Sequence, residues 1–259
     1  MARIAVLTSM TPKPWSPSPD LEGFIPFVVD GNTYQTWYRV FGDLKASTTP
    51  LVALHGGPGL THDYLLPISD LAANGTAVIF YDQLGNGRST HLPDLPTSFW
   101  TVDLFINELV NLLSHFKVDS DFALLGHSWG GMYMLRPMMP ELLLTMDTGI
   151  LALEFEIRRK PEGLKKLVLS SSLADMKAWN ESNARLVQAF PKEIQEAMAV
   201  GMKDLKVSGP AMKAFRAVHG CSLKPFPEEY LYSLDQAMII DPTVGKAMYV
   251  GEPLVSFSI

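Results

Sequence analysis

The chain has 259 residues, of which 47% are apolar and 19% are charged, which suits a soluble globular protein with a sizeable core. Its formal net charge of -6 argues against a nucleic-acid-binding surface, and no apolar run is long enough to span a bilayer. The single cysteine, Cys221, excludes an internal disulfide and a cysteine-rich metal site. Because the first residues lack the features of a signal peptide, we expect a cytoplasmic protein.

Residues 1–21 are expected to form an extended lead-in, since prolines crowd the segment TPKPWSPSP. The stretches FIPFVVDG and YQTWYRVFGD predict two strands separated by an Asp-Gly-Asn turn at residues 30–32. Four short apolar stretches, PLVAL, AVIFYD, DFALL and LKKLVL, then predict buried strands, and residues 101–116 have the apolar spacing of a helix. Apolar strands separated by helices indicate a mostly parallel sheet covered by helices on both faces.

The character of the sequence changes after about residue 175. Residues 176–248 contain short helical patterns interrupted by prolines, with no strand pattern among them. We therefore expect a core of residues 22–175 and a helical lid of residues 176–248, followed by a short tail of residues 249–259.

The segment GHSWG, from Gly126 to Gly130, matches the pattern G-x-S-x-G and directly follows an apolar strand. A serine at such a strand-to-helix turn has a strained backbone, and the glycines on either side avoid clashes. The Ser128 hydroxyl would then project from the carboxyl edge of the sheet, where the backbone N–H of Trp129 can face a developing oxyanion. Because three fixed positions also occur by chance, a glycine-rich turn without catalytic duty is the alternative.

A second glycine-rich turn, HGGPG from His55 to Gly59, follows the strand PLVAL. In a serine hydrolase of this architecture the second oxyanion donor comes from this position, which points to the N–H of Gly57. An ordinary tight turn is the alternative interpretation. Two such turns after strands of one parallel sheet favour the catalytic interpretation.

Three motifs together, HGGPG, YDQLGNGRS and GHSWGGM, resemble the proline iminopeptidase group of α/β hydrolases, from about residue 22 to about residue 248. The resemblance implies an α/β-hydrolase fold and an aminopeptidase or amidase that releases a small amino-terminal residue, often proline, from a peptide or amide. It implies that Ser128 is the nucleophile and that the amides of Gly57 and Trp129 form the oxyanion hole. Enzymes of this group need no metal or organic cofactor.

The resemblance also implies that the helical lid helps to hold the free amino group of the substrate. Glu228 and Glu229 are candidate carboxylates for that contact, although solvated charges at the start of a helix are the stronger interpretation. The loop from Asp82 to Ser89 would support the site structurally. The sequence identifies no other substrate-binding residue and does not indicate the oligomeric state.

The partners of the serine are harder to find in the sequence. A serine hydroxyl needs a general base, and in this fold the acid and the histidine follow the serine, on strands after the lid. Only His219 follows Ser128, and it falls in the lid, as do Asp235 and Asp241. We therefore expect the last strands of the core, the triad acid and the triad histidine to be missing, and this chain to have little activity.

Two segments depart from the family pattern. Residues 133–150 come between the serine turn and the expected helix, and Pro137 and Pro140 would each cost about 3 kcal/mol inside a helix. The tail of residues 249–259 also differs. Our hypothesis is that both segments are translated from unspliced intron sequence, and a genuine insertion and tail are the alternative.

Two functional hypotheses therefore stand. The first is a serine aminopeptidase or amidase acting on small peptides or amino-acid amides. The second is a non-catalytic α/β-hydrolase relative that binds a small ligand or a partner protein. Epoxide hydrolases and dehalogenases of this fold are disfavoured, because they place an aspartate where Ser128 stands.

Overall fold

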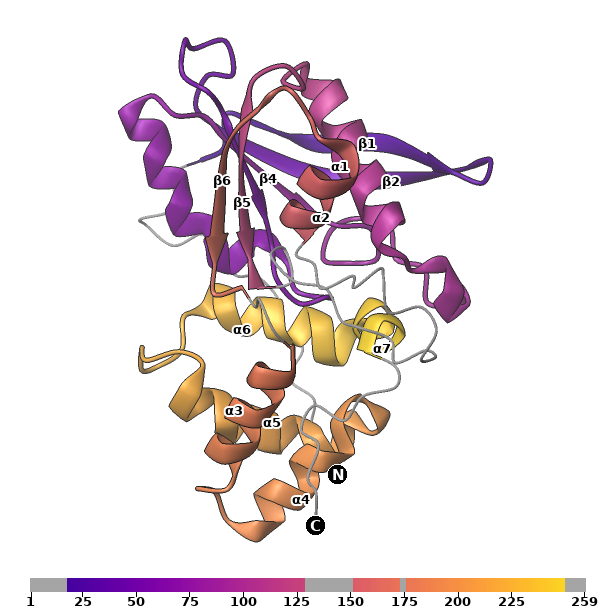
Figure 1. The fold of residues 1–259 in the computed structure, drawn as a ribbon, viewed down its shortest axis with the longest axis vertical. Helices are drawn as coiled ribbons and strands as arrows, with labels where there is room; N and C mark the ends of the chain where they lie inside the picture. The colour runs from indigo at the N-terminus through magenta and orange to yellow at the C-terminus, as the bar shows by residue number, and fades with distance from the viewer. Residues whose placement is uncertain (1–17, 129–150, 173–175, 250–259) are drawn as a thin grey trace.

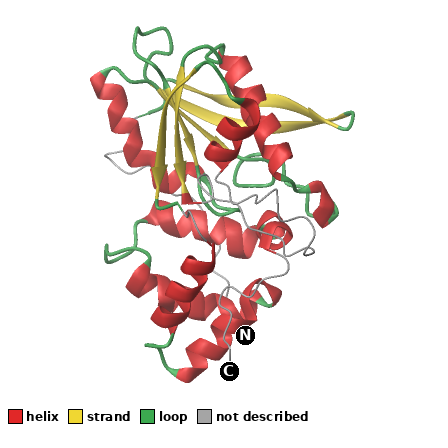
Figure 2. Cartoon of the chain, in the orientation of Figure 1, coloured by secondary structure: helices red, strands yellow, loops and turns green. Residues whose placement is uncertain are grey.

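The computed structural model describes residues 18–128, 151–172 and 176–249. Within these residues a six-stranded sheet occupies one half of the molecule and helices alone make up the other half (Figures 1 and 2). Trp129, the predicted insertion and the tail beyond Tyr249 lie outside the described residues. None of the described helices has the length and apolar character needed to cross a bilayer.

The sheet is mixed, with parallel strands over most of its width and an antiparallel hairpin at one edge. Its strands are β1 (Leu21–Val29), β2 (Asn32–Phe41), β3 (Leu51–Leu54), β4 (Val78–Asp82), β5 (Phe122–His127) and β6 (Leu164–Ser170). They lie in the order β1-β2-β4-β3-β5-β6, in which the last four strands run parallel and β2 is antiparallel to both of its neighbours. The antiparallel edge follows from a two-residue turn in which Asp30 and Gly31 both have positive φ, because such a turn joins adjacent antiparallel strands.

Helices cover both faces of the sheet. On one face lie α1 (Val102–Phe116) and α2 (Leu151–Arg159), and on the other lies η1 (His62–Asn74), a 3-10 helix. Helix α1 begins where the Thr101 side chain accepts a hydrogen bond from the N–H of Leu104, and it ends at Lys117 in the left-handed conformation.

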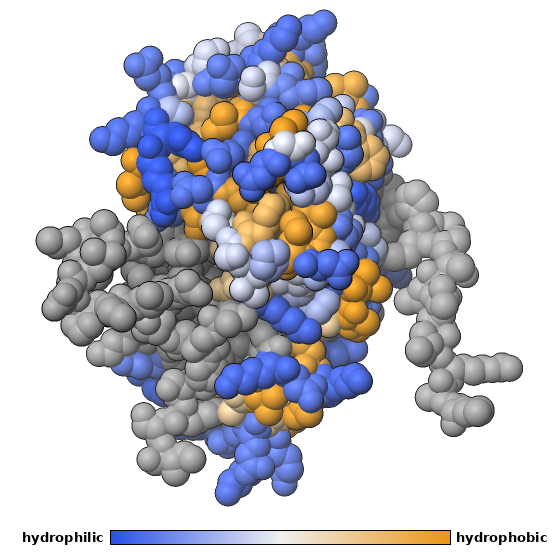
Figure 3. Space-filling view, turned by 90° about the vertical axis from the view of Figure 1, so that its right-hand side faces the viewer, coloured by the Kyte–Doolittle hydropathy of each residue, from blue (hydrophilic) through white to orange (hydrophobic). Residues whose placement is uncertain are grey.

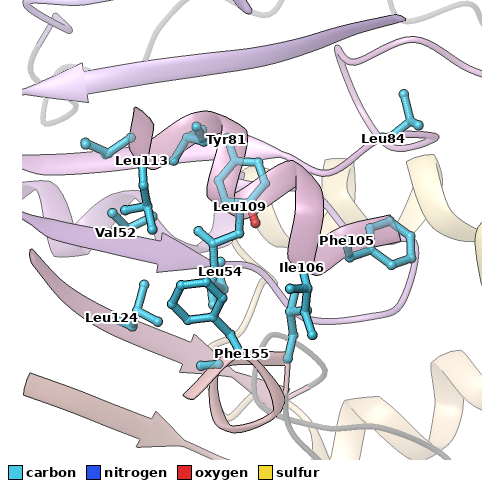
Figure 4. Close-up of a cluster of buried hydrophobic side chains, with 14 of the residues drawn as sticks. Val52, Leu54, Tyr81, Leu84, Phe105, Ile106, Leu109, Leu113, Leu124 and Phe155 are labelled. Carbon is cyan, nitrogen blue, oxygen red and sulfur yellow. The ribbon is translucent and has the colours of Figure 1, made fainter. Parts of the chain in front are cut away.

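The main core lies between the sheet and the helix pair α1 and α2. Figure 4 shows side chains of α1 and of Phe155 in α2 gathered against residues of β3, β4 and β5. The fully buried members include Val52, Leu54, Leu109 and Leu124. Burial of each such side chain contributes about 1.5–3 kcal/mol, so this cluster fixes the positions at which β3, β4 and β5 end.

The helical half contains α3 (Met176–Val187), α4 (Lys192–Val200), η4 (Gly201–Lys203), α5 (Leu205–His219), α6 (Glu228–Asp235), η5 (Gln236–Ile240) and α7 (Thr243–Tyr249). It has a small apolar cluster of its own, formed around Val187, Met198, Ala211 and Met212. Helix α6 lies across the carboxyl ends of β5 and β6 (Figure 1). The helical character agrees with the sequence pattern, while the domain boundaries drawn from the sequence stay predictions.

On the face seen in Figure 3, hydrophilic residues dominate both ends of the molecule, and hydrophobic residues are interspersed between them. Strand β6 is an edge of the described sheet, and its Val168 and Leu169 are 45% and 43% exposed.

Candidate active site

Ser128 lies directly after β5, at the carboxyl end of a strand that has β3 on one side and β6 on the other. Its φ is 53°, in the left-handed region that non-glycine residues rarely adopt. Such a backbone costs on the order of 1–3 kcal/mol and persists only where the surroundings impose it. This is the local geometry that a serine nucleophile turn requires.

The HGGPG turn lies against the serine turn because β3, which precedes it, pairs with β5. A Cβ atom added at Gly56 would lie 3.1 Å from the carbonyl oxygen of His127 and 3.1 Å from the Cβ of Ser128. Gly57 has a φ of 130°, which also favours glycine. The structure thus brings two of the predicted site residues, Ser128 and Gly57, into neighbouring turns, while Trp129 lies outside the described residues.

Tyr64, in the first turn of η1, connects the two turns. The N–H of Gly56 donates to the Tyr64 hydroxyl over 2.7 Å, and that hydroxyl lies 2.8 Å from Nδ1 of His127. The Gly56 amide is therefore already used and is not available to an oxyanion. Sequence reasoning missed Tyr64, because no motif marks it.

Asp82, the last residue of β4, is fully buried and anchors the loop that follows. Its Oδ1 accepts hydrogen bonds from the backbone N–H of His62 over 3.0 Å and from Nδ1 of the same residue over 2.8 Å. Its Oδ2 accepts from the backbone N–H of Arg88 over 3.0 Å. Burial by itself raises the pKa of Asp82, but His62 and then Arg88 outweigh it and hold that pKa well below its usual range.

His62, Asp63 and Asp82 offer ligand atoms of the kinds that metal ions bind, and these atoms lie close together. The guanidinium group of Arg88, however, donates two hydrogen bonds of 2.9 Å to Asp63 and lies 3.3 Å from Asp82. It also lies over the ring of Trp37, 4.8 Å from its centroid. The charge of Arg88 fills the place that a cation would take, so these residues suit an ion-pair cluster better than a metal site.

His55, the first residue of the HGGPG turn, holds that turn to the loop after β4. Its Nε2 accepts a hydrogen bond from the N–H of Gln83 over 3.0 Å, and its Nδ1 donates to the carbonyl oxygen of Gly56 over 2.9 Å. Burial lowers the pKa of His55, and the donor at Nδ1 with the acceptor at Nε2 corresponds to the neutral ring. His55 is therefore a structural link between two loops.

Glu108 of α1 contacts the loop after β4 from the side of the main core. Its carboxylate accepts from the N–H of Leu84 over 3.0 Å and from the Thr36 hydroxyl over 2.5 Å. Burial raises the pKa of Glu108 to about 7, despite the lowering effect of these two hydrogen bonds. A titratable carboxyl group thus lies beneath the loop that the sequence predicted to support the site.

The helical half is attached directly over these loops. The N–H of Thr61 donates to the Ser233 hydroxyl of α6 over 2.8 Å, and that hydroxyl lies 3.2 Å from the carbonyl oxygen of Thr61. His91 contacts Asp241 through a 2.6 Å distance between Nδ1 and a carboxylate oxygen. A Cβ added at Gly59 would lie 3.4 Å from the Cβ of Ala237. Helix α6 and the residues after it therefore lie over the HGGPG turn.

The remaining predicted residues lie in the helical half. Glu228 is exposed in the first turn of α6 and Glu229, next to it, is half-buried. His219 ends α5 and packs against the rings of Phe190 and Phe215, at 5.8 and 4.9 Å between centroids. Among the described residues no histidine is hydrogen-bonded to Ser128.

Comparison with known proteins defines the class first. A family model described as the Alpha/beta hydrolase family matches residues 51–253, from the strand before HGGPG through the helical half. The strand order and the position of the serine turn agree with that class.

Individual relatives then narrow the assignment. Proline iminopeptidases from Clostridium botulinum and from Lactobacillus delbrueckii subsp. bulgaricus are 37% and 35% identical, over 70% and 81% of this chain. The solved structure of the Mycobacterium smegmatis proline iminopeptidase is 31% identical with a TM-score of 0.67, covering 92% of this chain and 76% of that one. VinJ is 38% identical with a TM-score of 0.73, covering 88% of this chain and 70% of that one. The chain belongs to the proline iminopeptidase family of α/β hydrolases.

The chain spans only part of the curated relatives that it matches. It covers 54% of the Clostridium botulinum protein and 65% of the Lactobacillus delbrueckii protein.

Proposed function

We propose that this protein is a serine aminopeptidase or amidase of the proline iminopeptidase type, with Ser128 as its nucleophile. The observation that carries the proposal is the left-handed backbone of Ser128 at the end of β5, in contact with the glycine turn that ends β3. Membership of the proline iminopeptidase family supplies the substrate class, a peptide or amide with a free amino-terminal residue, often proline.

In the proposed reaction the hydroxyl oxygen of Ser128 attacks the carbonyl carbon of the first residue of the substrate. The carbonyl oxygen becomes negative, and the amides of Gly57 and Trp129 stabilise it as the oxyanion hole. The C–N bond then breaks, the leaving amine takes up the proton that the Ser128 hydroxyl released, and water hydrolyses the acyl-enzyme to the free amino acid and restores Ser128. Loss of one oxyanion donor from such a site lowers kcat by about 10²–10³.

The proposed reaction needs a general base for Ser128, and the histidines are the candidates. His127 adjoins Ser128, but its Nδ1 faces the Tyr64 hydroxyl, and burial lowers its pKa. The other five histidines contact the Asp82 loop, the helical half or α1, and not Ser128. The hydrogen bonds among the described residues therefore assign no general base to Ser128.

The position of the histidines also supports a second candidate function. A family member whose serine has no base can still bind a small amino-terminal ligand between the HGGPG turn and α6. This binding function predicts saturable association of proline amide without release of ammonia.

Labelling with a fluorophosphonate followed by intact-mass measurement tests the nucleophile. We expect one label per chain on the wild type and none on Ser128→Ala. Ser171→Ala is the matched control, because Ser171 follows the adjacent strand β6 with a similar φ of 50° and should still leave Ser128 labelled.

Hydrolysis of proline p-nitroanilide, measured on the same samples, tests the reaction. Turnover that disappears in Ser128→Ala and survives in Ser171→Ala supports the aminopeptidase. A chain that is folded by circular dichroism but takes no label contradicts the nucleophile assignment and leaves the binding function.

A further inference from the structure

A chain of hydrogen bonds crosses from the HGGPG turn to the serine turn through one side chain. The N–H of Gly56 lies 2.7 Å from the Tyr64 hydroxyl, which in turn lies 2.8 Å from Nδ1 of His127. The Tyr64 and His127 rings also pack edge to face, with 5.1 Å between centroids. Tyr64 belongs to η1, so a third element fixes the spacing of the turns that end β3 and β5.

The donor and the acceptor of each of these two hydrogen bonds can be assigned from the groups involved. A backbone N–H can only donate, so the Tyr64 oxygen accepts from Gly56. The single hydroxyl proton of Tyr64 is then directed at His127, whose Nδ1 must accept it. His127 is therefore neutral with its proton on Nε2, which agrees with the lowering of its pKa by burial.

The position of these two hydrogen bonds matters because Gly56 and His127, at their two ends, each adjoin a proposed reacting group. Gly56 precedes Gly57, the proposed oxyanion donor, and His127 precedes Ser128, the proposed nucleophile. The two turns are already in contact, since a Cβ at Gly56 would lie 3.1 Å from the Cβ of Ser128. A shift of either turn would change the distance between the nucleophile and the oxyanion hole, and misplacement by about 1 Å can cost about 100-fold in rate.

We propose that Tyr64 is a positioning residue, whose hydroxyl holds the oxyanion turn and the Ser128 turn at the spacing that the reaction requires. The proposal rests on the proposed function of Ser128. Tyr64 itself donates no proton to the substrate and forms no bond with it. Burial raises the pKa of Tyr64 well above its usual range, so the hydroxyl keeps the proton that this role requires.

The test uses the full chain and the variant Tyr64→Phe, which keeps the ring and removes the hydroxyl. Tyr81→Phe is the matched control, because Tyr81 is fully buried in β4 and its hydroxyl has no hydrogen-bond partner among the described residues. The first readout is the second-order rate constant for fluorophosphonate labelling. We expect it to fall 10- to 100-fold in Tyr64→Phe and to stay within about twofold of wild type in Tyr81→Phe.

The second readout is the tautomer of His127, from the nitrogen chemical shifts of the ¹⁵N-labelled ring. We expect Nε2–H in the wild type and in Tyr81→Phe, and a loss of that single tautomer in Tyr64→Phe. A role in packing alone would leave this signature unchanged. Unchanged labelling, or an unchanged tautomer, in a folded Tyr64→Phe protein would overturn the proposal.

Substitutions of His127 test the same contact from its other end, and they serve if Tyr64→Phe does not fold. His127→Asn keeps an acceptor near the position of Nδ1 and should label within about threefold of wild type, whereas His127→Leu should label as slowly as Tyr64→Phe. Equal labelling rates in these two variants would contradict the proposed positioning role of the Tyr64–His127 hydrogen bond. A wild-type chain that takes no label contradicts the function of Ser128 instead, and the tautomer measurement then decides alone whether Tyr64 donates to His127.

Discussion

The sheet half and the helical half differ in what their buried polar groups contact. At the ends of β3, β4 and β5 these groups bond to one another across several loops, as Asp82, His62 and Arg88 do. In the described helical half the buried polar residues are fewer. Ser208 bonds within its own helix region, while Ser233 and Asp241 bond to the sheet half.

This difference indicates how the two halves are stabilised. The sheet half has a large apolar core and a polar network in which Asp82, His62 and Arg88 bond to one another within that half. The helical half has a small apolar cluster of its own, and its position over the site is fixed by polar contacts at a few points and by Val244 of α7, which is buried in the main core. Regions with few buried contacts open at lower free energy than the rest of a protein. We therefore expect the helical half to separate from the HGGPG turn before the sheet unfolds.

The largest effect is expected when the polar network of the sheet half is broken. Asp82→Ala leaves His62 and Arg88 without their buried carboxylate and should lower the free energy of unfolding by roughly 3–5 kcal/mol. Asp204→Ala, which removes the N-cap of α5 in the helical half, should cost about 1 kcal/mol. Urea unfolding of both variants provides the measurement. Equal losses would contradict the comparison of the two halves.

The contrast also explains which features the sequence could predict. Local patterns were sufficient for the hairpin at Asp30 and Gly31, for the helix after Thr101 and for the serine turn after β5, because each depends on residues close together in the chain. The pairing of this hairpin with β4 was not predicted, since strand pairing depends on which strands become neighbours.

Contacts over long sequence separation were equally out of reach. Tyr64 meets His127 across 63 residues and His91 meets Asp241 across 150, and no local pattern encodes either contact. Glu108 lies on a helix whose apolar spacing was recognised, yet its burial depends on Leu84 in a distant loop. The serine turn was therefore predictable from its motif, but the residues that hold its surroundings in place were not.

The next largest effect is a change in the free energy of unfolding with pH, which we expect from Glu108. Its pKa is raised from an ordinary 4.5 to about 7 in the folded protein, so folding favours the protonated carboxyl group. Stability that is present below about pH 4.5 should therefore be lost as the pH rises through 7, by roughly 3 kcal/mol at about 1.4 kcal/mol per pH unit. In Glu108→Gln this loss should disappear. Thermal unfolding from pH 5 to 8 measures it, and parallel pH profiles for variant and wild type would contradict the assignment.

A smaller effect is expected where α6 joins the HGGPG turn. Ser233→Ala removes the acceptor of the Thr61 N–H, and a buried N–H without a partner costs about 1–3 kcal/mol. Hydrogen exchange should show faster exchange at Thr61 and in α6, with little change in β5. Ser222→Ala, an exposed serine in the same half, is the control. Faster exchange throughout the sheet would mean that the two halves unfold together.

The smallest effect is expected at the second attachment, between His91 and Asp241. Nδ1 of His91 faces a carboxylate oxygen and Nε2 faces the carbonyl oxygen of Gly87 over 2.8 Å. Each ring nitrogen of His91 therefore faces an oxygen that can accept a hydrogen bond. Asp241→Asn keeps the hydrogen bond from the N–H of Thr243 and removes the negative charge. Because His91 is partly exposed, we expect a cost of about 1 kcal/mol.

This attachment has its own pH dependence. Burial alone raises the pKa of Asp241, but the hydrogen bonds from Thr243 and His91 outweigh it and lower that pKa. The stabilisation is therefore present above about pH 4 and lost as the pH falls through the folded value. Asp241→Asn should show no such loss, whereas Asp235→Asn, an exposed control at the end of α6, should follow the wild type. Limited proteolysis of the helical half between pH 3 and pH 6 distinguishes them, because the stabilisation from a charged Asp241 is present only at the higher pH.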